Sequence, residues 1–134
     1  MLLPHGTTVA VLDGTKMHLF HNTGSAGATK LSPLPEPAIG SENKGSGSRH
    51  QSSSANPDES RLGEDNFAAA SAEWLNRQAL GGKIDNLFVI ATPKTLGELR
   101  KHYHKVLQGK LLGEVAKDLT GHSAADIEAA VDKA

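Results

Sequence analysis

The sequence predicts a mixed α/β fold with the element order β-β-β-loop-α-β-α-β-α. Residues 7–34 contain three strand-like runs separated by turns, which predicts an antiparallel meander. Residues 86–91 (NLFVIA) form the most hydrophobic run, and helix-like stretches precede and follow it, as in a parallel βαβ unit. The length of 134 residues suits one domain. We therefore expect a single domain, residues 1–134, built on a five-stranded mixed sheet covered by helices.

The first strand is expected at Thr7–Asp13 (TTVAVLD), which is apolar on both faces and therefore central in the sheet. Asp13-Gly14 predicts a type I′ hairpin turn into the alternating run Lys16–His21. Thr29–Leu34 is the third strand. Prolines at 33, 35 and 37 place it at a sheet edge, because proline cannot donate a hydrogen bond to a neighbouring strand.

Residues 40–58 interrupt this pattern. Nine of these 19 residues are Gly or Ser, and Ala55 is the one apolar residue. Such a segment cannot bury enough surface to offset the entropy of ordering it, so we expect a flexible loop.

Helical spacing then predicts a helix with its first turn near Glu64 and its end at Gly81-Gly82. Its expected buried stripe consists of Phe67, Ala70, Trp74, Leu75 and Gln78. Residues 86–91 follow as the buried parallel strand.

The next helix is expected to begin with Thr92 as N-cap and Pro93 at the first position, and to end at Gly109. Its expected buried stripe consists of Leu96, Leu99, Tyr103, Val106 and Leu107. Lys110–Ala116 is the fifth strand, with Leu112 and Glu114 on one face. Ser123 and Asp126 predict the start of a last helix, whose core contacts are Ile127 and Val131.

Composition excludes several classes of protein. The 14 Lys and Arg against 15 Asp and Glu give a net charge of −1, unlike a protein that coats nucleic acid. The absence of Cys excludes disulfides, a thiolate nucleophile and sulfur-ligated zinc. No apolar run approaches the ~20 residues that span a bilayer, and Met1–Pro4 does not resemble a secretory signal. We expect a cytoplasmic protein without membrane insertion.

Three antiparallel strands followed by βα units form a ribonuclease-H-like arrangement. Two-metal nucleases need carboxylates that converge at strand ends and on a facing helix. Asp13 is a candidate for the first carboxylate, with Glu64 or Glu73 on the helix. The fourth strand ends in Ala91-Thr92, however, and Asp85 lies at its opposite end, which disfavours this chemistry.

Other catalytic and metal-binding patterns are missing from the sequence. His18 and His21 face opposite sides of a strand, and His102 and His104 do not share a helix face. No GxSxG nucleophile motif is present. We therefore expect no metal site, no cofactor and no enzymatic activity.

Positive charge gathers in the stretch 94–110. Lys94, Arg100, Lys101, Lys105 and Lys110 lie there with one acid, Glu98. Together with Arg49 and His50 of the loop they are compatible with a face that binds RNA phosphates. The absence of interleaved aromatic side chains, which would stack on bases, favours a solvated helix face instead.

Four segments carry a resemblance to a known family: VAVLDGTKMHLFHNTG (9–24), GSGSRHQSS (45–53), IDNLFVIATPKTLGELRK (84–101) and KLLGEVAKDLTGHS (110–123). Together they resemble the bacterial host attachment protein family, described as required for attachment to host cells. The most specific parts are ATPKTLGELR (91–100) and KDLT (117–120).

That family is similar, more remotely, to the middle domain of archaeal and eukaryotic release factors and of the ribosome-rescue protein Pelota. In release factors the loop before the long helix carries Gly-Gly-Gln, which helps water attack the peptidyl-tRNA ester. Here the loop reads KGSGSRHQ (44–51), so Gln51 lacks the preceding Gly-Gly pair. The resemblance therefore does not imply ester hydrolysis.

Three functions follow as expectations. The first is a non-enzymatic host-attachment protein, a scaffold that presents the loop and the basic face to a macromolecular partner through Arg49, His50, Gln51, Lys94, Arg100, Lys101, Lys105 and Lys110. The second is a ribosome- or tRNA-associated factor of the release and rescue line. The third is a metal-dependent nuclease. The sequence does not specify the partner or the oligomeric state.

Overall fold

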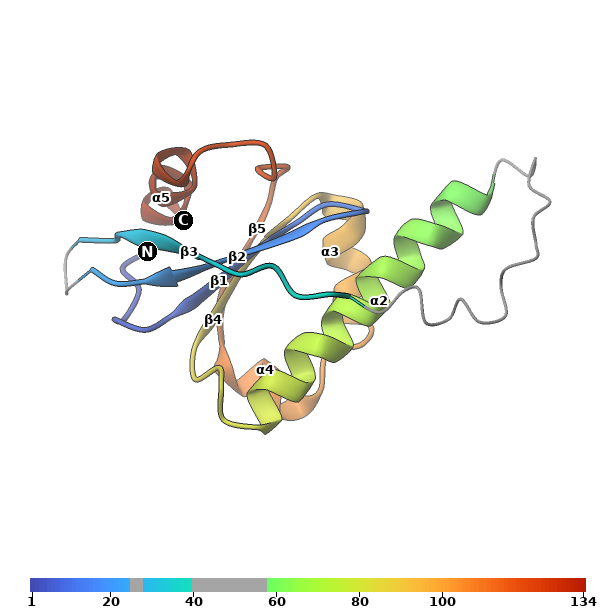
Figure 1. Ribbon diagram of the computed structural model, residues 1–134, viewed down its shortest axis with the longest axis horizontal. Coiled ribbons are helices and arrows are strands. Elements are labelled where there is room, and N and C mark those ends of the chain that lie inside the picture. The colour runs from blue at the N-terminus through green and yellow to red at the C-terminus, as the bar shows by residue number, and fades with distance from the viewer. Residues whose placement is uncertain (25–27, 40–57) are drawn as a thin grey trace.

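The computed structural model describes residues 1–24, 28–39 and 58–134 (Figure 1). The elements in chain order are β1 Thr8–Leu12, β2 Met17–Asn22, β3 Leu31–Leu34, α2 Asp58–Leu80, β4 Leu87–Ala91, α3 Pro93–Arg100, α4 Lys105–Lys110, β5 Leu111–Ala116 and α5 Ala124–Lys133. The five strands form one mixed sheet in the order β3-β2-β1-β4-β5. The β1–β2 and β2–β3 pairs are antiparallel, whereas β1–β4 and β4–β5 are parallel. The predicted fold class is confirmed. The expected loop at 40–58 lies outside the described residues, except for Asp58.

β1 and β4 form the centre of the sheet, as their continuous apolar runs predict. Every residue of both strands is buried, and the strands pair in register from Thr8 with Leu87 to Leu12 with Ala91. Alternate side chains enter the two hydrophobic cores on opposite faces of the sheet. β3 pairs with β2 at one margin of the sheet, with Pro33 opposite Phe20, so the predicted edge position is also confirmed.

Helices cover both faces of the sheet (Figure 1). On one face α2, α3 and α4 contribute Leu75, Leu99 and Leu107, all fully buried, to the larger core. On the other face α5 contributes Ile127 and Val131 to the smaller core, as predicted. Among the described residues, no helix is long and apolar enough to cross a membrane.

The hairpin between β1 and β2 forms where the sequence predicts it, but the turn is not type I′. Among the described residues, positive φ angles occur at Gly6 and Gly82, and neither Asp13 nor Gly14 has one. The Asp13 carboxylate replaces a backbone acceptor instead: Oδ1 accepts hydrogen bonds from the Lys16 amide at 2.7 Å and the Thr15 amide at 2.8 Å. Aspartate side chains commonly stabilise turns in this way.

α2 begins at Asp58, earlier than the predicted first turn near Glu64, and its buried face is rotated from the predicted one. Of the predicted stripe, Leu75 is fully buried, whereas Phe67 and Trp74 are partly exposed at the core margin. The other buried positions of α2 are Ala68, Ser71, Ala72 and Ala79. Small side chains at these positions let the helix backbone approach the sheet closely, and the large aromatic rings pack beside the contact.

The prediction of one helix from Pro93 to Gly109 is wrong, because the chain breaks between α3 and α4. Asn76 of α2 binds both sides of the break. Its Nδ2 donates to the His102 carbonyl at 2.8 Å, and its Oδ1 accepts from the His104 amide at 2.9 Å. His104 then caps α4 by accepting the Val106 amide on Nδ1 at 3.0 Å. As a result Val106 is 38% exposed rather than part of a buried stripe.

β5 contains a bulge, and the predicted facing of its side chains is therefore wrong. Leu87 pairs with Leu111 and Phe88 pairs with Gly113, so Leu112 is the extra residue. Leu112 consequently packs with Val115 against the smaller core, not on the face of Glu114. A single inserted residue reverses the alternation of side chains beyond it.

Candidate functional site

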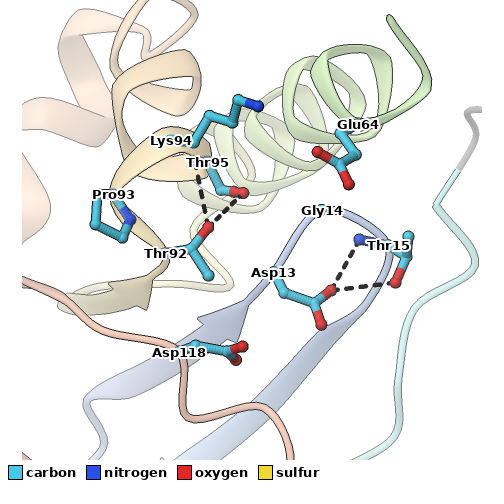
Figure 2. Close-up of a pocket in the computed structure, with 9 residues that line it drawn as sticks. All are labelled: Asp13, Gly14, Thr15, Glu64, Thr92, Pro93, Lys94, Thr95 and Asp118. Carbon is cyan, nitrogen blue, oxygen red and sulfur yellow. Dashed lines mark hydrogen bonds between the residues drawn. The ribbon is translucent and has the colours of Figure 1, made fainter. Parts of the chain in front are cut away.

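A cavity of about 500 Å³ lies where β1, β4 and β5 end, between α2 and α3 (Figure 2). It is lined by Asp13, Gly14, Thr15, Glu64, Thr92, Pro93, Lys94, Thr95 and Asp118. In the sheet, β1 has β2, the next strand of the chain, as its neighbour on one side and β4 as its neighbour on the other. The direction in which successive strands are added to the sheet therefore changes at β1. In open α/β sheets, ligands bind in the crevice outside the carboxyl ends of parallel strands at such a change of direction. Topology and cavity therefore identify the same candidate site.

Asp13 forms the part of the cavity that follows β1. Its Oδ1 accepts from the amides of Thr15 and Lys16 and is 3.2 Å from the Thr15 hydroxyl. Partial burial by itself raises the pKa of Asp13, but these hydrogen bonds and one from Thr120 outweigh it and lower the pKa below its ordinary value. Asp13 is therefore held as a carboxylate of fixed orientation.

Asp118 forms the part of the cavity that follows β5, and Thr120 links it to Asp13. The Thr120 hydroxyl oxygen lies 3.1 Å from Asp13 Oδ2 and 2.9 Å from Asp118 Oδ1. The Thr120 amide also donates to Asp118 Oδ1 at 3.3 Å. One hydroxyl, which has a single hydrogen, thus stands between two carboxylates contributed by distant segments of the chain.

The start of α3 forms the part that follows β4. Thr92 caps the helix and Pro93 occupies its first turn, as predicted. Thr92 Oγ1 accepts from the Thr95 amide at 3.4 Å and donates to Thr95 Oγ1 at 2.9 Å. Lys94, which is exposed, adds a positive charge beside these hydroxyls.

Glu64 closes the side of the cavity formed by α2, and it does so by packing over Gly14. A Cβ atom at position 14 would lie 2.6 Å from Glu64 Cγ. A side chain at position 14 would displace the Glu64 side chain, so glycine here lets Glu64 pack over the turn, and no positive φ is involved.

The structure brings together two of the carboxylates considered for metal chemistry, Asp13 and Glu64, and adds Asp118. Glu73 is exposed elsewhere on α2, and Asp85 lies before β4, at the opposite end of that strand. Within residues 1–24, 28–39 and 58–134, no three His, Asp or Glu side chains are placed to hold a metal ion. Sequence reasoning missed Asp118, although its position directly after the predicted fifth strand was the signal that could have found it.

The basic residues expected to form one face have different environments. Lys94 lines the cavity. Arg100 Nη2 is 2.7 Å from Glu114 Oε1, and Lys101 Nζ is 3.1 Å from Glu98 Oε1. The hydrogen bond from Lys101 is the main reason that the pKa of Glu98 is lowered.

The other expected binding residues are separated from this group. Lys110 Nζ donates to the carbonyls of Ala79 at 3.1 Å and Ile84 at 3.0 Å, which stabilises the end of α2. Lys105 is exposed at the start of α4 and forms no ion pair within the described part of the chain. Arg49, His50 and Gln51 lie outside the described residues.

Comparison with known proteins identifies the family of this chain. A search of curated proteins found no match. The family model of bacterial archaeo-eukaryotic release factor family 12 matches residues 6–131. This match includes the whole sheet, α2, α3, α4 and all but the last residues of α5. The chain therefore belongs to bacterial archaeo-eukaryotic release factor family 12.

Proposed function

We propose that this protein is a cytoplasmic, ribosome- or tRNA-associated factor of the release and rescue line. The observation that carries the proposal is the family match over residues 6–131. The family is named for release factors, so the match supports this function over the host-attachment role that the sequence also led us to expect. The five-stranded mixed sheet, with the long helix α2 between β3 and β4, agrees with a release-factor-like domain.

The proposed factor binds without hydrolysing peptidyl-tRNA. Gln51 stands in the stretch GSGSRHQSS (45–53), where Arg49 and His50 precede it. The Gly-Gly pair that gives the backbone its freedom before the release-factor glutamine is replaced. We therefore propose a role in occupying or recognising a ribosomal site rather than in releasing the peptide.

The proposed contact surface consists of the end of α3 and the start of α4, with Arg49, His50 and Gln51 of the preceding segment. The side chain of Arg100 is 57% exposed and that of Lys101 is 69% exposed, although both have carboxylate partners. Lys105 is exposed close by. Exposed ion pairs contribute little to stability, so these cations can exchange a carboxylate for an RNA phosphate at low cost. Lys110 would support this surface indirectly by holding the end of α2, and Lys94 belongs to the cavity.

Sedimentation of the protein with purified ribosomes over a range of salt concentrations tests the proposal. Binding should weaken steeply with salt, because phosphate contacts release counterions. The triple variant Arg100→Gln, Lys101→Gln, Lys105→Gln should make the salt dependence of binding shallower. The magnitude of the slope of log association constant against log salt concentration should fall by about 2 to 3.

The matched control removes the same charge elsewhere, through Lys30→Gln, Lys83→Gln and Lys133→Gln, all exposed positions. Its salt slope should stay within error of the parent protein, and both triple variants should retain the thermal unfolding midpoint of a folded chain. A protein that does not sediment with ribosomes at low salt, or a control that weakens binding as much as the test variant, would contradict the proposal.

A further inference from the structure

We propose that Glu98 and Glu114 compete internally with RNA phosphate: in the free protein their carboxylates hold the cations of the proposed contact surface, and RNA binding replaces them. This inference rests on the proposed function and deepens it, because it names the groups that limit the affinity of that surface. Its distinctive consequence is that removing either carboxylate tightens binding. The contacts and the exposure of the two ion pairs support it.

Glu114 projects from the edge strand β5 towards the end of α3. Arg100 Nε and Nη2 lie 3.0 Å and 2.7 Å from one and the same oxygen, Glu114 Oε1. The Tyr103 hydroxyl donates to the other oxygen, Glu114 Oε2, at 3.4 Å. The arginine fork binds most strongly when its nitrogens meet two separate oxygens. A phosphate offers two oxygens to the fork, so it is better matched to Arg100 than Glu114 is in this arrangement.

Glu98 of α3 holds two partners from the residues that follow it. Its Oε1 is 3.1 Å from Lys101 Nζ, and its Oε2 is 3.3 Å from His102 Nε2. The hydrogen bond from Lys101, with a further one from His102, lowers the pKa of Glu98 although desolvation opposes both. Glu98 is therefore a carboxylate at neutral pH, and it offsets positive charge that would otherwise be available to a ligand.

The cations lie on the solvent side of both pairs. The side chains of Arg100 and Lys101 are 57% and 69% exposed, whereas those of Glu114 and Glu98 are 16% and 19% exposed. An anion that approaches from solvent therefore reaches the cations before the carboxylates. The carboxylates remain behind the cations and repel the incoming phosphate, which lowers the affinity of the surface.

Replacing each glutamate by glutamine tests the inference, because glutamine keeps the shape and one acceptor oxygen while it removes the charge. Sedimentation with purified ribosomes at low salt measures the effect. Glu98→Gln and Glu114→Gln should each tighten binding about two- to fivefold, the range that an exposed ion pair allows. The double variant should tighten it about tenfold. The gain should shrink as the salt concentration rises, because salt screens the repulsion.

The matched control removes two negative charges from the opposite face of the sheet, through Asp126→Asn and Asp132→Asn on α5. Both positions are exposed, and Asp126, like Glu98, has a histidine partner, with His122 Nδ1 at 3.3 Å from its Oδ2. The control should bind ribosomes as the parent does, and thermal unfolding of every variant confirms that it is folded. A control that gains as much as the test variants would assign the gain to net charge and overturn the inference.

A double-mutant cycle locates the effect at the ion pair. Glu114→Gln should tighten binding in the parent but not in an Arg100→Gln background, because no restrained cation is then released. A gain of equal size in the two backgrounds would show that Glu114 does not act through Arg100, and the inference would be wrong.

The same measurements separate this inference from the proposed function. The inference alone fails if the parent sediments with ribosomes, the triple cation variant weakens binding, and neither glutamine variant tightens it. Both fail if the parent and the two glutamine variants do not sediment with ribosomes at low salt.

Discussion

The Asp13 carboxylate accepts a hydrogen bond from the Thr120 hydroxyl at 3.1 Å, although 107 positions separate the two residues in the chain. This contact joins the turn after β1 to the segment after β5. It fixes one wall of the cavity and keeps Asp118 beside Asp13. We expect it to contribute both to stability and to the arrangement of the carboxylates.

Replacement of Thr120 by Val should lower the free energy of unfolding by about 0.5–1.5 kcal/mol, because the hydroxyl is lost while the shape is nearly kept. The pKa of Asp13 should rise at the same time, since the Thr120 hydrogen bond is one of the contacts that lower it. Urea unfolding and an NMR titration of the Asp13 carboxyl measure the two effects. Thr120→Ser should restore both, and an unchanged Asp13 titration in Thr120→Val would show that the contact is absent in solution.

Asp13 should also give the protein a pH-dependent stability. Its pKa is lower in the folded chain than its ordinary value of 3.8. The stabilisation is therefore fully present above that value and is lost as the pH falls through the lower, folded pKa. In urea unfolding between pH 2 and 6, about the range these values require, Asp13→Asn should lose less stability on acidification than the parent. Equal acid sensitivity of the two proteins would exclude this role for Asp13.

Asn76 should be among the most sensitive polar positions. Asn76→Ala leaves the His102 carbonyl and the His104 amide without their side-chain partner, which should cost about 1–3 kcal/mol. Chemical denaturation measures this cost, and hydrogen exchange at the His104 amide should accelerate. Asn66→Ala, an exposed substitution on the same helix, is the matched control and should be nearly neutral. Similar losses in both variants would point to helix propensity rather than to the break between α3 and α4.

The rotation of α2 predicts an order of effects within its buried face. Leu75 is fully buried, so Leu75→Ala should cost about 2–5 kcal/mol. Trp74 is only partly buried at the core margin, so Trp74→Ala should cost less despite the larger side chain. Urea unfolding of the two variants tests the order, and a larger loss for Trp74→Ala would mean that the indole lies deeper than described.

The central strands could be predicted from the sequence because their burial follows from the apolar residues of each strand itself. Val9 to Leu12 and Leu87 to Ala91 are apolar without interruption, which is favourable only where both faces of the sheet are covered. The caps of α3 and α5 were predictable for the same reason, since Thr92 and Ser123 act on the helix that follows them.

Features that depend on distant contacts were not predictable. The break after Arg100 depends on Asn76, a residue of another helix, and the facing of β5 depends on a bulge at Leu112. The candidate site was predicted in part: Asp13 and Glu64 were considered together, but Asp118 joins them only once β5 is placed parallel to β4. Local patterns specify the elements, whereas the register between elements assembles the cavity.

The break between α3 and α4 also matches the length of the crossover to that of the strands. An unbroken helix over residues 93–110 would be about 27 Å long at 1.5 Å per residue, whereas the five residues of β4 span about 17 Å. The break between α3 and α4, which Asn76 of α2 binds on both sides, shortens this crossover. β5 therefore pairs with β4 from Leu111 beside Leu87 and ends level with it. A continuous helix would extend beyond the end of the sheet, so β5 could not begin beside the start of β4. The hydrogen bonds of Asn76 thus bear on the start of β5, the strand that leads to Asp118.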